Sequence, residues 1–201
     1  MNDAFIRGND SRNIPRMCGD QSGQITEEEY RAGVAGCQSI LRSNCKHVCF
    51  TGHRNAASTG VSLYPRLIQL ITEYIKLGTT DFYTGGAIGF DTLAARAVLY
   101  FKEQPAYSHI RLHLVLPCCS EDQTRRWTST QRAEFQDILS KADDVIYITN
   151  GHYYDGCLRD RNKKLIELAD ACICYCNDMR SGTGQTVRMA QNKGIFIDNL
   201  A

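Results

Sequence analysis

From residue 47 onward, short apolar or β-branched segments alternate with amphipathic stretches, and this alternation constrains the fold more than any other feature. Such an order is typical of a parallel sheet whose two faces are covered by helices. The sequence therefore predicts an α/β fold, a Rossmann-like three-layer sandwich with a mostly parallel central sheet. The predicted strands cover residues 47–50, 81–83, 111–116, 144–148, 171–175 and 194–197.

Three of the intervening stretches carry apolar residues at helical spacing. Their stripes are Leu63, Leu67, Leu70, Ile71 and Tyr74; then Leu93, Ala94, Ala97, Val98 and Phe101; then Phe135, Ile138 and Leu139. Before the first strand, Thr26 and Glu29 are spaced as in a capping box, which predicts a helix over 27–42. Residues 1–24 are polar and are expected to form a loose arm. We therefore expect an N-terminal extension over 1–45 and a Rossmann-like domain over 46–201.

Charge and hydropathy limit the class of protein. The 23 Lys and Arg residues nearly balance the 22 Asp and Glu residues, so the whole chain lacks the basic field of a dedicated nucleic-acid binder. The overall balance of charge still allows a local patch of basic residues on one surface. No apolar segment approaches the ~20 residues that span a bilayer, and the first 20 residues lack a signal-peptide core. We expect a cytoplasmic protein outside the membrane, whose ten cysteines are reduced thiols.

Polar or glycine-rich segments follow five of the predicted strands. They cover residues 51–54, 84–91, 117–120, 150–161 and 177–186. Ligands of an open parallel sheet bind beyond the carboxyl ends of the strands, where helix N-termini also point. We therefore expect a ligand cleft formed by 51–54, 84–91 and 180–186.

The second of these segments contains Gly85, Gly86, Ile88 and Gly89, ahead of Asp91. Its glycines predict a turn in which backbone N–H groups approach a phosphate, with Asp91 accepting a hydrogen bond from a sugar hydroxyl. The alternative is a tight turn in which Asp91 only complements a helix N-terminus. The pattern is neither the dinucleotide fingerprint nor a P-loop.

The segment after the first strand, Thr51-Gly52-His53-Arg54, places a titratable ring and a permanent cation at the mouth of the cleft. Both side chains are candidates to touch a ligand. Alternatively, His53 packs against the sheet and Arg54 is a surface charge.

The start of the last helix offers hydroxyl groups, flexible backbone and an arginine to a second anionic group. The candidate residues are Arg180, Ser181, Gly182, Thr183 and Thr186. The alternative is an elaborate helix cap formed by Ser181 or Thr183.

Asn162 is the polar member of a helical stripe that otherwise holds Leu158, Leu165 and Ala169. It either reaches a base or ribose in the cleft or satisfies a neighbouring loop backbone. In the Gly-flanked loop before it, Tyr153 and Tyr154 are candidates to stack on a base.

The cysteines do not form a predicted metal site. Cys172, Cys174 and Cys176 alternate along one strand, where such residues are about 6.8 Å apart, too far for neighbouring ligands of one zinc ion. They are expected in the core of the sheet. For Cys118 and Cys119 we expect a structural role. The sequence identifies no cofactor.

Four motifs carry a resemblance to a known family: VCFTGHR at 48–54, TGGAIGFD at 84–91, Arg161-Asn162, and SGTGQTV at 181–187. Together they resemble the YpsA-like branch of the SLOG superfamily, which also contains the DNA-processing protein DprA and the lonely-guy phosphoribohydrolases. The resemblance covers roughly 46–198. It implies a Rossmann-like domain that holds a nucleotide, an ADP-ribose-like molecule or a nucleic-acid segment between its glycine-rich loops.

Three functions follow from this resemblance. The leading hypothesis is a sensor-like or regulatory module that binds a nucleotide-like small molecule; single-stranded DNA binding, as in DprA, is the third. The second is hydrolysis of an N-glycosidic bond, as in the lonely-guy enzymes. Those enzymes use a Glu where this chain has Thr186, which leaves Asp91 or Asp160 as substitute carboxylates. The oligomeric state stays open, with a homo-oligomer among the alternatives.

Overall fold

The computed structural model describes residues 26–56, 63–149 and 151–201. The chain divides into two compact units, Met1–Ala35 and Gly36–Ala201. Helix α1 (Glu27–Arg42) begins in the first unit and ends in the second, and its bounds confirm the helix predicted over 27–42. The loose arm predicted over 1–24 lies outside the described residues.

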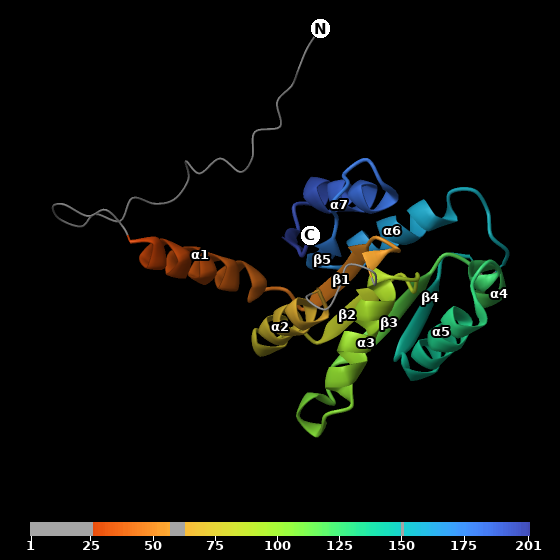
Figure 1. Cartoon of the computed structure of the whole chain (residues 1–201), viewed down its shortest axis with the longest axis horizontal. Helices are drawn as coiled ribbons and strands as arrows, with labels where there is room; N and C mark the ends of the chain where they lie inside the picture. Colours follow the sequence, from red (N-terminus) through yellow and green to blue (C-terminus); the bar gives the residue numbers. More distant parts are fainter. Residues whose placement is uncertain (1–25, 57–62, 150) are drawn as a thin grey trace, which may run out of the picture. The chain divides into compact units, whose positions relative to one another are not determined.

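A six-stranded parallel sheet forms the centre of the second unit (Figure 1). Every neighbouring pair of strands is parallel, which confirms the predicted Rossmann-like α/β class. The strands are β1 (His47–Gly52), β2 (Asp81–Thr84), β3 (Arg111–Leu116), β4 (Asp144–Tyr147), β5 (Ala171–Tyr175) and β6 (Phe196–Asn199). The last strand begins later than predicted because Gly194, at φ 76°, forms the left-handed C-cap of the preceding helix.

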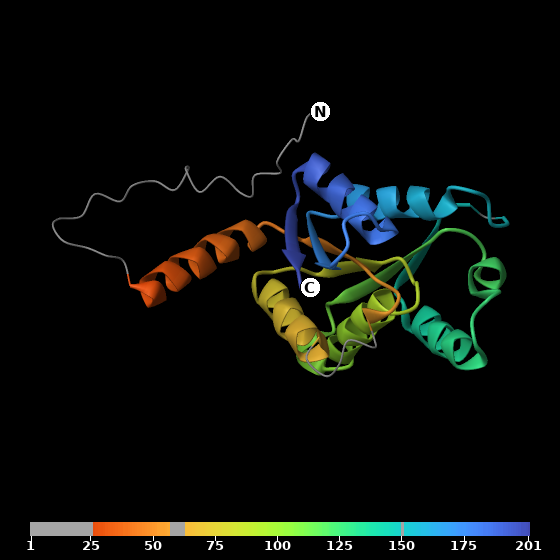
Figure 2. The same ribbon diagram turned by 45° about the horizontal axis from the view of Figure 1, so that its top comes forward.

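Helices cover both faces of this sheet, as Figures 1 and 2 show. One face carries α2 (Leu63–Lys76), α3 (Phe90–Lys102) and α5 (Ser129–Lys141), and the other carries α6 (Cys157–Leu168) and α7 (Gly182–Lys193). Two short elements, η3 (Pro105–Tyr107) and α4 (Ser120–Thr124), lie on either side of β3 in the sequence. No described helix combines the length and apolar character needed to cross a membrane.

The strands supply alternate residues to two separate cores, because successive side chains of a strand point to opposite faces. In β1, Val48 and Phe50 enter the larger core under α2 and α3, whereas Cys49 enters the core under α6 and α7. In β5, Ile173 joins the first core and Cys172 the second. The prediction of these strand cysteines as sheet core is confirmed.

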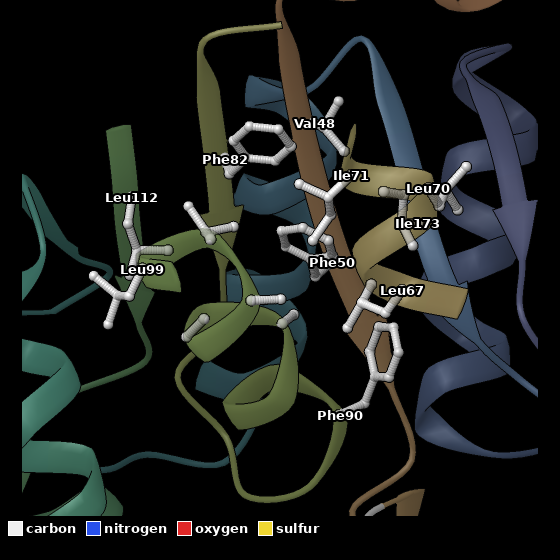
Figure 3. Packing of buried hydrophobic residues seen from close by; sticks show 14 of the residues in the cluster. Val48, Phe50, Leu67, Leu70, Ile71, Phe82, Phe90, Leu99, Leu112 and Ile173 are labelled. Atoms are coloured by element: carbon white, nitrogen blue, oxygen red, sulfur yellow. The ribbon is translucent and has the colours of Figure 1, made fainter. Parts of the chain in front are cut away.

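The larger core is built from the predicted helical stripes (Figure 3). Leu67 and Ile71 of α2 are fully buried against the sheet. On the sheet, the rings of Phe50 in β1 and Phe82 in β2 stack with centroids 5.9 Å apart. Phe90, the first residue of α3, extends this core toward the carboxyl ends of the strands. Core packing therefore fixes the start of α3 close to the predicted cleft.

The order of the strands locates the crevice where a ligand is expected. The sheet runs β4-β3-β2-β1-β5-β6, so the chain builds outward from β1 to β4 and then returns to the other side of β1. The switch point lies between β1 and β5. In open α/β sheets, ligands bind beyond the carboxyl ends of the strands at such a point.

Lys193 of α7 closes the end of α6. Its Nζ donates to the carbonyl oxygens of Ile166, Glu167 and Ala169 at 2.8, 3.0 and 2.8 Å. The last carbonyl groups of a helix have no partner within it, and the ammonium also faces the negative end of the helix dipole.

Lys193→Met should therefore lower the free energy of unfolding by about 1 kcal/mol in a urea titration. The matched control is Lys163→Met, because the Lys163 ammonium lies on the surface 4.0 Å from Glu167. That change should cost less than about 0.5 kcal/mol. Equal losses in the two variants would contradict a capping role for Lys193.

Candidate functional site

A pocket of about 470 Å³ lies at the switch point, between the segments that follow β1 and β5. The first turns of α6 and α7 complete its walls. Ten residues singled out in the sequence line it: Thr51, Gly52, His53, Arg54, Asp91, Tyr153, Asn162, Ser181, Gly182 and Thr183. The sequence thus predicted where the pocket lies and most of its walls.

A second pocket, of about 680 Å³, adjoins the first beyond the ends of β2 and β3. The two pockets share Arg54, Ala87, Tyr153, Leu158 and Arg161 as lining residues. The second is further lined by Ile88, Pro117, Asp122, Gln123, Arg125, Arg126, Trp127, Gln131 and Asp155. We call the two pockets together the carboxyl-edge groove.

A buried ion pair forms the wall that the two pockets share. Arg161 of α6 is 7% exposed, and its Nη1 lies 3.3 Å from Oδ2 of Asp91, which is 5% exposed. The same oxygen accepts the backbone N–H of Ala87 at 3.3 Å. The buried Nε of Arg161 has no hydrogen-bond partner among the described residues. Arg161 therefore keeps donor capacity beside the groove.

Burial dominates the electrostatics of this pair. It raises the pKa of the Asp91 carboxyl, and the opposing charge of Arg161 is the smaller effect. Burial likewise lowers the pKa of the Arg161 guanidinium, against the charge of Asp91. Their mutual attraction thus does not offset the loss of water around both charges. An anion in the groove would stabilise the guanidinium further, and perturbed pairs of this kind are concentrated at functional sites.

At two glycines of the predicted phosphate turn, neighbouring side chains occupy the space that a Cβ atom would fill. A Cβ at Gly85 would overlap Nη1 of Arg161. Gly86 has φ 61°, and its Cβ would lie 2.8 Å from the Leu116 side chain. Both glycines are buried, and neither lines the groove. The Arg161 guanidinium therefore packs against Gly85, and the phosphate turn stays a prediction.

Gly89 holds the loops after β1 and β2 together. Its φ of 86° favours glycine, and a Cβ there would overlap the backbone carbonyl of Arg54. Next to it, the N–H of Phe90 donates to the carbonyl of His53 at 3.2 Å. A Cβ at Gly52 would in turn overlap the Phe90 side chain. These contacts bring the loop that carries His53 and Arg54 against the start of α3.

His53 connects the two strands at the switch point. The Nε2 of its ring accepts the backbone N–H of Asn177 at 3.2 Å, and the backbone N–H of His53 donates to the carbonyl of Tyr175 at 3.3 Å. The ring therefore packs between the two loops and also lines the pocket, and its contact with a ligand stays a prediction. Arg54 is exposed and lines both pockets.

Ser181 caps the helix that begins at the pocket. Its Oγ accepts the N–H of Gly184 at 3.1 Å and donates to the carbonyl of Asp178 at 2.6 Å. The cap interpretation is thus confirmed for Ser181, which also lines the pocket with Gly182 and Thr183. The positive end of the α7 dipole faces this space and favours an anion there.

Three further candidates do not line the groove. The buried Thr186 hydroxyl donates to the carbonyl of Gly182 at 3.2 Å, and the exposed Arg180 lies 3.7 Å from Asp178. Asp160 accepts the Tyr154 hydroxyl at 2.6 Å and lines another pocket beside α7. Of the described residues around the switch-point pocket, Asp91 is the one carboxylate, and Arg161 holds it.

The helical stripe read from the sequence selected Asn162, which is half-buried and lines the switch-point pocket. The polar residue buried in α6 is its neighbour Arg161, on the same face as Cys157 and Leu165. The stripe is therefore shifted by one residue only in its first half, at Leu158 and Asn162, whereas Leu165 and Ala169 are buried as predicted. Sequence reasoning also missed Arg125 and Arg126, which line the second pocket beside Trp127. The Arg-Arg-Trp run at 125–127 is the pattern that would have identified them.

Comparison with known families matches residues 58–194 to the YspA SLOG family. Among similar relatives, UPF0398 protein BH1768 of Halalkalibacterium halodurans is 28% identical over 116 residues, which are 57% of this chain and 59% of that protein. A UPF0398 protein of Bacillus thuringiensis (strain Al Hakam) is 25% identical over 134 residues, 66% of this chain and 71% of the relative. The match to the first relative thus spans less than two thirds of its length.

Two solved structures share the fold. DNA processing protein A from Helicobacter pylori, described with its single-stranded DNA binding mode, has a TM-score of 0.53 and 20% identity over 79% of this chain and 66% of that chain. DprA from Streptococcus pneumoniae has a TM-score of 0.54 and 16% identity over 80% of this chain and 52% of that chain. At these identities the likeness concerns the fold alone.

Proposed function

The chain belongs to the YspA SLOG family, and from this premise we propose that its carboxyl-edge groove binds a segment of single-stranded nucleic acid. The observation that carries the proposal is the continuity of two arginine-lined pockets along one edge of the sheet. Each pocket, at about 470 and 680 Å³, is the size of a small-ligand site. The two pockets adjoin and share five lining residues, so a ligand that lies along both would span more than one nucleotide.

The charge of the groove differs from that of the whole chain. Five arginines line it, against three aspartates among the described lining residues. The arginines are Arg54, Arg125, Arg126, Arg159 and Arg161. One of the aspartates, Asp91, is already paired with Arg161. A groove with this excess of cations suits a phosphate backbone, although the net charge of the chain is only +1.

Two aromatic side chains offer stacking faces beside these cations. Tyr153 is 49% exposed and lines both pockets. Trp127 lines the second pocket, with its ring edge-on to Phe135 at 5.6 Å. Stacking of a base on an aromatic ring contributes about 1–3 kcal/mol without reading the sequence. Arginines with interleaved aromatics are typical of single-strand binding grooves.

One of the structural neighbours supports the same function. DNA processing protein A from Helicobacter pylori is described as binding single-stranded DNA, and it shares this fold. The sequence had favoured a nucleotide-like small molecule over DNA on the basis of near-neutral net charge. The local excess of arginines in the groove removes that objection. We further propose residues 46–201 as the binding domain and 1–45 as an extension to it.

A second candidate function is binding of a nucleotide-derived small molecule in the switch-point pocket alone. The observation that favours it is that the start of α7 and the buried cation of Arg161 both line this pocket, so that a helix dipole and a guanidinium favour an anion there. Such a ligand would leave the second pocket, with Arg125, Arg126 and Trp127, without a role.

Fluorescence anisotropy with labelled oligothymidylates separates the two candidates. We expect the affinity to rise with oligonucleotide length until the groove is filled. The logarithm of the binding constant should fall linearly with the logarithm of the salt concentration, with a slope of about −0.7 for each phosphate contacted. Arg126→Gln should reduce that slope by about one such contact. Arg96→Gln, which removes an arginine that does not line either pocket, is the matched control.

Absence of oligonucleotide binding, or binding independent of salt, would contradict the proposal. The small-molecule candidate makes a different prediction, namely that a mononucleotide or ADP-ribose raises the melting temperature by mass action while longer oligonucleotides add nothing.

A further inference from the structure

Three side chains with metal-binding atoms meet beside the carboxyl-edge groove. One ligand atom each from Cys119, Asp122 and His152 lies within 4.8 Å of the other two. Cys119 and Asp122 come from the segment after β3, and His152 comes from the segment after β4. The fold thus brings together a thiol, a carboxylate and an imidazole that are distant in sequence.

Backbone contacts hold the two segments in this arrangement. The N–H of Cys119 donates to the carbonyl of Gly151 at 3.2 Å, and the N–H of Tyr153 donates to Oδ2 of Asp122 at 2.8 Å. The same oxygen lies 3.1 Å from Nδ1 of His152. The backbone on both sides of His152 is therefore tied to the segment that carries the other two groups.

The separations suit a small tetrahedral ion. With zinc bonds of about 2.0–2.3 Å to nitrogen, oxygen and sulfur, neighbouring ligand atoms lie about 3.3–3.6 Å apart. Asp122 and His152 are already near this spacing at 3.1 Å. Since all three ligand atoms lie within 4.8 Å of one another, the Cys119 sulfur needs a shift of at most about 1.5 Å, within the reach of a rotation about a side-chain bond. The His152 side chain, 91% exposed, can also reorient.

The donor set selects the class of ion. A thiolate and an imidazole favour zinc and similar transition-metal ions over Mg²⁺ and Ca²⁺, which prefer oxygen ligands. Three protein ligands leave one position of a tetrahedral site open, the arrangement of catalytic rather than structural zinc sites. Asp122 also lines the second pocket, so the cluster borders the groove.

We propose that Cys119, Asp122 and His152 bind one zinc ion or a chemically similar divalent cation, with one coordination position left for an exogenous ligand. Binding displaces the proton of the Cys119 thiol, so the ion and its thiolate together add one net positive charge at the rim of the carboxyl-edge groove, close to Arg125 and Trp127 in the sequence. The site stands independently of what the groove itself binds. The alternative to a metal site is a surface contact between His152 and Asp122 in which Cys119 takes no part.

The test uses the untagged full-length chain, titrated with Zn²⁺ and, as a spectroscopic substitute, Co²⁺. We expect one bound ion per chain after gel filtration, and with Co²⁺ the near-ultraviolet thiolate charge-transfer band together with the visible bands of tetrahedral coordination. His152→Ala should weaken binding by at least about tenfold, and Cys119→Ser should abolish the charge-transfer band. Circular dichroism checks the fold, which His152→Ala should leave unchanged because its side chain is exposed.

Matched controls are His109→Ala, which removes another exposed imidazole, and Cys37→Ser, which removes an exposed thiol. Both should bind Zn²⁺ as the unaltered chain does. The proposal is overturned if Co²⁺ gives no charge-transfer band, or if His152→Ala and His109→Ala change the affinity equally. A stoichiometry of one ion that survives Cys119→Ser together with His152→Ala would also overturn it, since the ion would then be bound elsewhere.

Discussion

Arg161→Met is expected to lower the free energy of unfolding by about 3 kcal/mol, at the lower end of the range for breaking a buried ion pair, and to abolish oligonucleotide binding. Methionine keeps an apolar stem of similar length but removes the guanidinium that faces Asp91 at 3.3 Å. The carboxylate is then buried without its cation. The cost stays at the lower end because burial already raises the pKa of Asp91, which favours the neutral form. Urea titration and fluorescence anisotropy measure the two effects.

The double variant Arg161→Met with Asp91→Asn separates stability from binding. Asparagine keeps an acceptor for the N–H of Ala87 but carries no charge, so much of the lost stability should return. Oligonucleotide binding should not return, because the cation at the shared wall is still missing. Recovery of binding in the double variant, or an unchanged stability in the single one, would contradict the role assigned to Arg161.

The stability loss in Arg161→Met should also depend on pH. Burial raises the pKa of the Asp91 carboxyl in the folded chain, so the folded state holds this proton more tightly than the unfolded state. The contribution of this proton to the free energy of unfolding is fully present below the pKa that Asp91 has in the unfolded chain. It is lost as the pH rises through the higher pKa that Asp91 has in the folded chain. The single variant should therefore approach the stability of the unaltered chain as the pH is lowered.

Gly89→Ala is expected to cost about 3 kcal/mol or more, the second large effect. An alanine there must adopt φ 86° and ψ −120°, and its Cβ would overlap the backbone carbonyl of Arg54. Neither the backbone of α3 nor the loop after β1 can yield without moving His53 and Arg54 away from the groove. Thermal or urea unfolding measures the stability, and anisotropy should show weaker oligonucleotide binding.

Gly194→Ala provides the matched control. Gly194 also has a positive φ, 76°, but no described atom lies within 4 Å of its Cβ position. That substitution should cost only about 1 kcal/mol, the strain of a left-handed residue at a helix C-cap. It should leave oligonucleotide binding unchanged. Equal losses at the two glycines would show that backbone strain alone, and not packing between the loops, explains the effect at Gly89.

The alternation of apolar strands and amphipathic helices was sufficient to predict the fold, because burial on both faces of a parallel sheet imposes it. Strand ends were predicted less well. β1 continues to Gly52, beyond its apolar residues, because Gly52 is in register with Tyr175 of β5. Such an extension depends on a partner strand more than one hundred residues away in the sequence, which local patterns do not contain.

The position of the site was predictable for the same reason, since topology alone brings the loops to one edge of the sheet. The roles of Gly85 and Arg161 were not. Arg161 and Asp91 are 70 residues apart, and only the folded chain shows that the guanidinium occupies the space above Gly85. A glycine that admits a phosphate and one that admits a buried arginine look the same in sequence.

The most direct test of the proposed function is amide hydrogen exchange of the full chain, with and without a saturating oligothymidylate. We expect slower exchange in the segments along the groove on both sides of the shared wall. They are 52–54, 87–91, 122–127, 153–161 and 181–185. Protection confined to the segments of the switch-point pocket would indicate a small-ligand site instead. Protection on other surfaces, or none at a saturating concentration, would contradict nucleic-acid binding in the carboxyl-edge groove.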